Sequence, residues 1–105
     1  MPRLTTPPGL PRGVEIAIDA LGNRARIEIL RALSRSQSLT LPELAETVGA
    51  TSVSVLKHLR RLEAHGLVVA DEPPGLRQGK HVRWSVIPGA LDRAVRMLSD
   101  YVSGR

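Results

Sequence analysis

Residues 41–62 read LPELAETVGATSVSVLKHLRRL, and their pattern predicts two short helices joined by a tight turn. Ala45, in the first helix, is small enough for two helices to cross at close range. Gly49 supplies the positive φ that a tight turn requires, because glycine has no Cβ. Val55 is placed to fill the space between the helices. The segment therefore has the pattern of a helix-turn-helix, whose second helix is built to enter the major groove of DNA.

The boundaries of these helices are marked by capping signals. Thr40 and Glu43 form a capping box, in which each side chain accepts a hydrogen bond from the other residue's backbone N–H. Thr51 or Ser52 caps the second helix, which runs to about residue 65. Gly66 has the position of the glycine that follows a helix C-terminus.

Working outward, helical spacing of apolar residues predicts further helices on both sides of this segment, and alternation predicts two strands after it. Turn-forming residues at 73–80 predict a hairpin tip between the strands. Trp84, in the second strand, is predicted to lie in the core. The predicted fold is mainly α with a small β-hairpin, in the order α-α-α-α-β-β-α. The predicted elements are helices 14–21, 23–33, 40–48, 52–65 and 90–102, and strands 67–71 and 82–87.

Composition limits the classes of protein that this chain can belong to. Its 105 residues provide for one domain, which we place at 14–105. Residues 1–13 are rich in proline and predict a flexible or extended arm. The net charge of +5 favours an anionic partner such as nucleic acid. The chain has no cysteine, which excludes disulfides and thiolate metal sites. No secretory signal or membrane span is visible, so we expect a cytoplasmic, nucleoid-associated protein.

The outward face of the second helix carries small, apolar or basic side chains suited to double-stranded DNA. A polar or apolar group in the groove reads base edges, whereas a basic group on the flank binds phosphates. The predicted base contacts are Ser52, Val53, Ser54, Leu56 and Lys57. The predicted phosphate contacts are Thr51, His58, Arg60, Arg61, Arg77, Lys80 and Arg83. His58 and His81 are about equally well explained by structural or solvated positions, and His65 suits a helix C-terminus.

Several motifs together resemble the ArsR-like family of winged helix-turn-helix regulators. The stretch LGNRARIEIL at 21–30 resembles the opening signature of the family. ELAE at 43–46 resembles the first helix of its reading head, and VLKHL at 55–59 resembles its recognition helix. LEAHGLV at 62–68 resembles the passage into the wing.

The resemblance implies a homodimer that binds an operator and usually represses transcription. Family members commonly dimerise through their first and last helices, here 14–21 and 90–102. The implied interface residues are Val14, Ala17, Ile18, Leu21, Leu91, Ala94, Val95, Leu98, Tyr101 and Val102. This sequence departs from the family at Leu56, where a small polar residue is common, and at Arg24, where proline is common. Because the chain also lacks the cysteines and the C-terminal histidines of metal sensors, the sequence predicts no metal site.

Other functions remain open at this point. No catalytic arrangement or phosphate-binding loop is visible, so an enzyme is not expected and no cofactor is implied. An architectural or recombination-accessory DNA-binding protein would have the same features. A protein-interaction module on the same scaffold is a second alternative. The sequence alone does not identify the operator, the regulated genes, the direction of regulation, any effector or the role of the arm.

Overall fold

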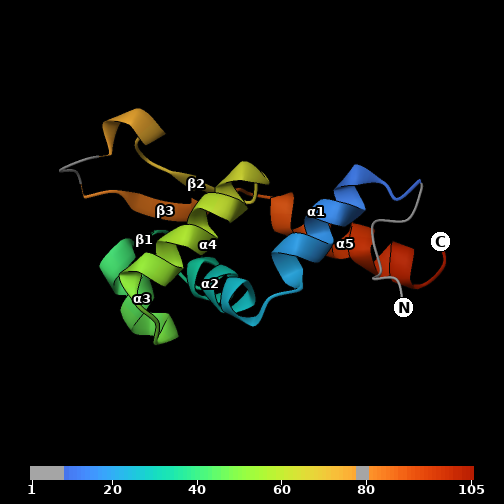
Figure 1. Ribbon diagram of the computed structural model, residues 1–105, viewed down its shortest axis with the longest axis horizontal. Helices are drawn as coiled ribbons and strands as arrows, with labels where there is room; N and C mark the ends of the chain where they lie inside the picture. Colours follow the sequence, from blue (N-terminus) through green and yellow to red (C-terminus); the bar gives the residue numbers. More distant parts are fainter. Residues whose placement is uncertain (1–8, 78–80) are drawn as a thin grey trace, which may run out of the picture.

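The computed structural model describes residues 9–77 and 81–105 as five helices, a short 3-10 turn and three strands (Figure 1). The predicted fold class is confirmed. The elements in chain order are α1 (Arg12–Leu21), α2 (Arg24–Ser34), β1 (Leu39–Thr40), α3 (Leu41–Val48), α4 (Ser52–Ala64), β2 (Val68–Ala70), η1 (Pro74–Leu76), β3 (Arg83–Val86) and α5 (Ala90–Val102).

The core is aliphatic apart from one aromatic side chain. Leu, Ile, Val and Ala from every helix meet at its centre, and Trp84 of β3 lies among them almost fully buried, as predicted. The largest wholly buried side chains of α4 are Val55, Leu59 and Leu62. Their spacing places them on one stripe of the helix, so the opposite side of α4 is left facing solvent.

The sheet contains one strand more than the sequence predicted. Its order is β1-β3-β2, and both pairings are antiparallel. The hairpin β2–β3 is confirmed, with Val69 opposite Ser85. β1 pairs Leu39 with Trp84, and its two residues are too few to show the alternation that marks a strand. This extra pairing fixes the start of α3 against the base of the wing.

The first helix begins at Arg12, whereas the sequence predicted an arm through residue 13 and a helix from Val14. Pro11 stands immediately before α1 with a φ of −61°, and its carbonyl accepts hydrogen bonds from Val14 and Glu15. Proline suits this position because the first N–H groups of a helix have no partner within it. The prolines of residues 1–13 therefore led to a predicted start of α1 that is two residues too late.

Both ends of α3 have the predicted chemistry. Thr40 Oγ1 accepts from the Glu43 backbone N–H at 3.3 Å, and Glu43 Oε1 accepts from the Thr40 N–H at 2.8 Å. Gly49 follows the helix with φ 70° and ψ 39°, which is the left-handed conformation. The N–H groups of Gly49 and Ala50 both donate to the Ala45 carbonyl, which closes the turn.

The wing is joined to α4 by a Schellman motif. Gly66 has φ 76°, and its N–H donates to the Glu63 carbonyl. The Leu67 N–H donates to the Leu62 carbonyl, and both leucine side chains are buried. This pattern of two bonds and an apolar contact sets the direction in which the chain leaves the helix.

The molecule has two ends of different construction. Figure 1 shows α1 and α5 side by side at one end, with α3, α4 and the wing at the other. α5 packs chiefly against α1, whereas α2 contacts both α3 and α4. The α1–α5 pair therefore projects from the part of the chain that carries the helix-turn-helix.

We expect Gly49→Ala to lower the free energy of unfolding by about 1–2 kcal/mol, the cost of a left-handed conformation for a residue with a Cβ. No atom lies within 4 Å of the position where that Cβ would be, so the effect is conformational and not steric. Urea unfolding measures the change. Gly49→Asn is the matched control, because asparagine adopts this conformation more readily. Equal stability of the alanine variant and the unaltered protein would contradict the assignment of the turn.

Candidate nucleic-acid interface

α4 presents its N-terminal half to solvent. Thr51 caps the helix, with its Oγ1 accepting from the Ser54 backbone N–H at 3.1 Å. Ser52, Val53 and Lys57 are exposed, and Val53 keeps 70% of its surface accessible. The exposed part of α4 therefore carries a hydroxyl, an apolar side chain and a lysine, all accessible to another molecule.

Two of the predicted base contacts lie closer to the protein than the other three. Ser54 and Leu56 are half-buried, and Leu56 packs against the edge of the core. Ser52, Val53 and Lys57 are thus the predicted base contacts that the structure leaves exposed. Leu56 lies on the side of α4 that faces the wing, where it lines a pocket.

The adjacent arginines of α4 have different surroundings. Arg60 is exposed, and within the described part of the chain it makes no hydrogen bond or ion pair. Arg61 points toward α1, where its Nε donates to Asp19 Oδ2 at 2.6 Å. Consequently the Arg60 guanidinium is unpaired among the described residues, whereas that of Arg61 is held by Asp19 through Nε with 59% of its side chain still exposed.

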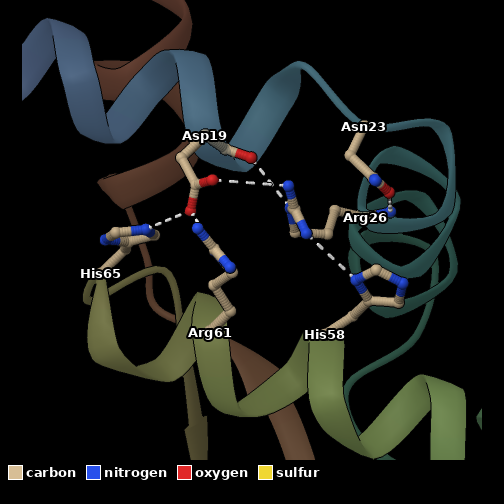
Figure 2. Close-up of polar contacts among 6 residues, drawn as sticks. All are labelled: Asp19, Asn23, Arg26, His58, Arg61 and His65. Carbon is tan, nitrogen blue, oxygen red and sulfur yellow. Dashed lines mark hydrogen bonds and ion pairs between the residues drawn. The ribbon is translucent and has the colours of Figure 1, made fainter. Parts of the chain in front are cut away.

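Asp19 is the centre of a polar cluster that joins three helices (Figure 2). Its Oδ2 also lies 2.6 Å from His65 Nε2, at the end of α4. Arg26 of α2 completes the cluster by donating from Nε to the Asp19 backbone carbonyl at 2.8 Å, and its Nη2 lies 3.5 Å from Oδ1. Hydrogen bonding from Arg61, followed by that from His65, outweighs partial burial and lowers the pKa of Asp19 below its ordinary 3.8.

His58 faces α2 and accepts a hydrogen bond. Arg26 Nη1 lies 3.1 Å from His58 Nδ1, and because a guanidinium can only donate, Nδ1 must be unprotonated. Burial, together with the positive charges of Arg26 and Arg61, lowers the pKa of His58 below its ordinary 6.5. The neutral ring keeps its proton on Nε2, which Figure 2 shows directed away from Arg26.

Two of the predicted phosphate contacts in the wing have partners within the chain. Arg77 makes a bidentate ion pair with Glu63 at the end of α4, and its guanidinium lies over the Trp84 ring at 4.9 Å from the centroid. Arg83 donates from Nε and Nη2 to the side chain and carbonyl of Ser38. Lys80, the third prediction, lies outside the described residues.

The predicted dimer residues divide into buried and exposed sets. Val14, Ala17 and Ala94 are already buried between α1 and α5 of the same chain. Leu21, Leu91 and Leu98 are half-buried at the edge of this packing. The exposed set consists of Ile18, Val95, Tyr101 and Val102, to which the structure adds Met97.

Other kinds of site find no support in residues 9–77 and 81–105. No group of three or more histidines or carboxylates there could hold a metal ion. No helix in these ranges has the length and apolar character that a membrane crossing requires.

These features define a winged helix-turn-helix DNA-binding domain: a capped helix pair, an outward-facing second helix and an adjoining hairpin. A model of the helix-turn-helix domain family matches residues 21–69. An ArsR-like transcriptional regulator from Rhodococcus sp. RHA1 is 25% identical with a TM-score of 0.68, and the match covers 88% of this chain and 79% of that one. No curated protein sequence matches the chain significantly.

Further solved structures have the same architecture at lower identity. NolR from Sinorhizobium fredii is 24% identical with a TM-score of 0.65, and 96% of each chain is covered. The homodimeric DNA-binding domain of Mb0332 from Mycobacterium bovis, a possible ArsR-family regulator, is 22% identical with a TM-score of 0.60. That match covers 88% of this chain and 77% of the other. The chain therefore has the winged helix-turn-helix fold of ArsR-family transcriptional regulators, a class of DNA-binding proteins and not of enzymes, and the resemblance seen in its motifs is confirmed.

The Asp19 cluster and the Glu63–Arg77 pair were not found by sequence reasoning. Asp19 lies 42 residues from Arg61 and 46 from His65, and no local spacing connects residues so far apart. The only local signal was that Asp19 is a carboxylate in the last turn of its helix, whereas the other carboxylate, Glu15, lies in the first turn. A negative charge is unfavourable at a helix C-terminus unless cations compensate it.

We expect Asp19→Asn to lower the free energy of unfolding at neutral pH, because it removes the negative charge that pairs with Arg61 and Arg26. The lowered pKa of Asp19 fixes the sign of the pH dependence. Its contribution is fully present above the ordinary value of 3.8 and is lost as the pH falls through the lower, folded-state pKa.

Urea unfolding of both proteins at a series of pH values tests this expectation. The difference between them should be largest at neutral pH and should close in acid. Glu46→Gln, which removes an exposed carboxylate of α3, is the matched control and should give a small difference throughout. A difference for Asp19→Asn that persists unchanged into acid would contradict the electrostatic explanation.

Proposed function

We propose that this protein is a sequence-specific transcriptional regulator that binds double-stranded DNA as a homodimer and represses from a pseudo-palindromic operator. The observation that carries this proposal is the placement of α4. Its apolar stripe is buried in the core, and its capped N-terminal half faces solvent with Ser52, Val53 and Lys57 exposed. This is the part of a recognition helix that contacts base edges in the major groove.

Within this proposal the side chains have separate roles. Lys57 donates to guanine O6 or N7, Ser52 bonds a base edge, and Val53 contacts a thymine methyl. Ser54 and Leu56 contribute at the margin of the same face. Arg60 and the hydroxyl of Thr51 bind phosphates and set the position of α4 in the groove.

The remaining cations contribute in a different way. Arg61 and His58 hold α4 against α1 and α2. Of the two, Arg61 adds positive potential near the DNA backbone, without a required direct contact. Arg77 and Arg83 stiffen the wing through Glu63 and Ser38. Lys80 stays a predicted phosphate contact of the wing. A protein of this kind acts in the cytoplasm, in association with the nucleoid.

The proposed dimer forms through the exposed apolar side chains of the α1–α5 pair. Ile18, Val95 and Tyr101 keep between 43% and 49% of their surface, and Val102 keeps 75%. A second copy would cover them, as expected for a monomer too small to bury them itself. The homodimeric state of the Mycobacterium bovis domain supports the proposal of a dimer. Two copies would then place their α4 helices in successive major grooves, about 34 Å apart.

We expect Lys57→Ala to relax base preference at one position of the bound site, weakening binding to the preferred sequence by about 1–3 kcal/mol. The affinity for a duplex changed at that position should fall much less. Fluorescence anisotropy on the two duplexes measures the difference. If the variant kept both the affinity and the base preference of the unaltered protein, the assignment of Lys57 to the major groove would be wrong.

Arg60→Ala should weaken binding to all sequences alike. It should also lower the slope of log affinity against log salt by about one for each phosphate that Arg60 neutralises. The same titration on preferred and scrambled duplexes provides the measurement. Arg31→Ala is the matched control, because Arg31 is also an exposed arginine but lies on α2. A salt slope that falls equally in both variants would show a general effect of charge and not a direct role of Arg60.

Val95→Glu should convert the dimer to a monomer, because it places a charge in the centre of the proposed apolar interface. Sedimentation equilibrium measures the mass of the complex in solution. Val69→Glu is the matched control: Val69 has a similar exposure of 45% but lies on β2, away from α1 and α5. Dissociation by both variants, or by neither, would contradict the proposed interface.

Selection of bound fragments from a random duplex pool tests the function as a whole. An enriched inverted repeat, bound much more tightly than a scrambled duplex, is the expected result. Equal, strongly salt-dependent binding to every duplex would instead indicate an architectural role. The absence of any DNA binding would overturn the proposal and favour a protein-interaction module.

A further inference from the structure

A pocket of about 700 Å³ lies between the helix-turn-helix and the wing. Its volume is within the range of cavities that hold small organic ligands. The start of α3 provides Leu41 and Pro42, α4 provides Leu56 and Arg60, and β3 provides Trp84. Elements far apart in the sequence thus line one pocket. The DNA contacts proposed above do not require a pocket at this place, so its presence needs a separate explanation.

Most of the pocket wall is apolar. Leu41, Leu56 and Val82 contribute aliphatic side chains, and Pro42 and Pro74 add rigid rings. Because Arg77 already covers one face of the Trp84 ring, the indole is held in a fixed position. Rigid walls of this kind favour a flat hydrocarbon group, since binding then orders few side chains of the protein.

The charge of the lining is positive. Arg60, Arg77 and His81 are its ionisable members, and no carboxylate from residues 9–77 or 81–105 lines the pocket. Glu63 offsets the charge of Arg77 through their ion pair. Arg60 is left as the arginine of the lining without a partner in the described part of the chain. An apolar space with one free guanidinium fits a molecule that has a ring at one end and a carboxylate at the other.

We propose that this pocket binds a small aromatic carboxylate, with the ring between Leu56 and the prolines and the carboxylate on Arg60. Since Arg60 is also a proposed phosphate contact, the bound molecule competes with DNA. Only this last consequence rests on the proposed function. Binding of the carboxylate itself does not require that the protein bind DNA.

The pocket contains its own reporter, because Trp84 is the only tryptophan in the chain. We would titrate the full-length protein, without DNA, with 3-phenylpropanoate and follow Trp84 emission. The neutral 3-phenylpropanamide has the same ring and chain, so it separates the contribution of the charge. We expect saturable binding of the carboxylate, with an affinity roughly tenfold above that of the amide, as for one charge-assisted hydrogen bond.

Two matched variants locate the site. Arg60→Gln should weaken binding of 3-phenylpropanoate roughly tenfold and leave that of the amide nearly unchanged. Arg31→Gln, which removes an exposed arginine of α2 outside the pocket, should leave both unchanged. Circular dichroism confirms that each variant is folded.

Two results would overturn the proposal. One is the absence of a saturable change in Trp84 emission. The other is binding that Arg60→Gln leaves unaltered, since the carboxylate would then lie elsewhere. A titration with duplex DNA in the presence of the probe is a separate experiment. Failure to bind any DNA would contradict the proposed function. The Trp84 emission measurement would still decide whether the pocket binds a ligand.

Discussion

Burial of one stripe of α4 is the constraint on which the rest of the structure depends. Val55, Leu59 and Leu62 are buried almost completely, and together they occupy the centre of a core that has no phenylalanine and only one tryptophan. Rotating α4 to hide its other face would expose these side chains and bury Lys57 and Arg60 without partners, at a cost of several kcal/mol. The packing that stabilises the fold therefore also determines which residues of α4 face solvent, and these include the proposed contacts with DNA.

Contacts at the ends of α4 then limit how the helix can move. The Asp19 cluster connects its last two turns to α1, and the Schellman motif connects its end to β2. Arg77 links the wing to the same end of the helix through Glu63. Because α1 packs on α5, the chain provides a continuous path from the proposed dimer surface to the proposed DNA surface. A dimer that recognises a fixed half-site spacing needs a rigid connection between these two surfaces. With a flexible connection, the distance between the two α4 helices would vary.

Local sequence signals predicted most of this fold. The capping box at Thr40, the positive φ of Gly49 and the Gly66 helix end all follow from residues within a few positions of one another, and the structure confirms each. β1 was missed because two residues cannot show alternation. The start of α1 was placed late because a proline before a helix and a proline in an arm look alike in sequence.

The site was predictable only in part, for a related reason. Helical periodicity identifies which side chains of α4 face outward, and Ser52, Val53 and Lys57 do so. It cannot show which cations have partners, because Asp19–Arg61 and Glu63–Arg77 join residues from different elements. Two arginines adjacent in sequence thus have different surroundings. The pocket is likewise a property of the packed structure, since its walls come from α3, α4 and β3.

The central claim is that α4 enters the major groove, and methylation protection on the selected duplex tests it most directly. Dimethyl sulfate modifies guanine N7 in the major groove and adenine N3 in the minor groove, so the two grooves are distinguished in one experiment. The account predicts guanine N7 protection in two patches about 10 base pairs apart on one face of the duplex. Protection confined to adenine N3, with guanine N7 fully reactive, would contradict it.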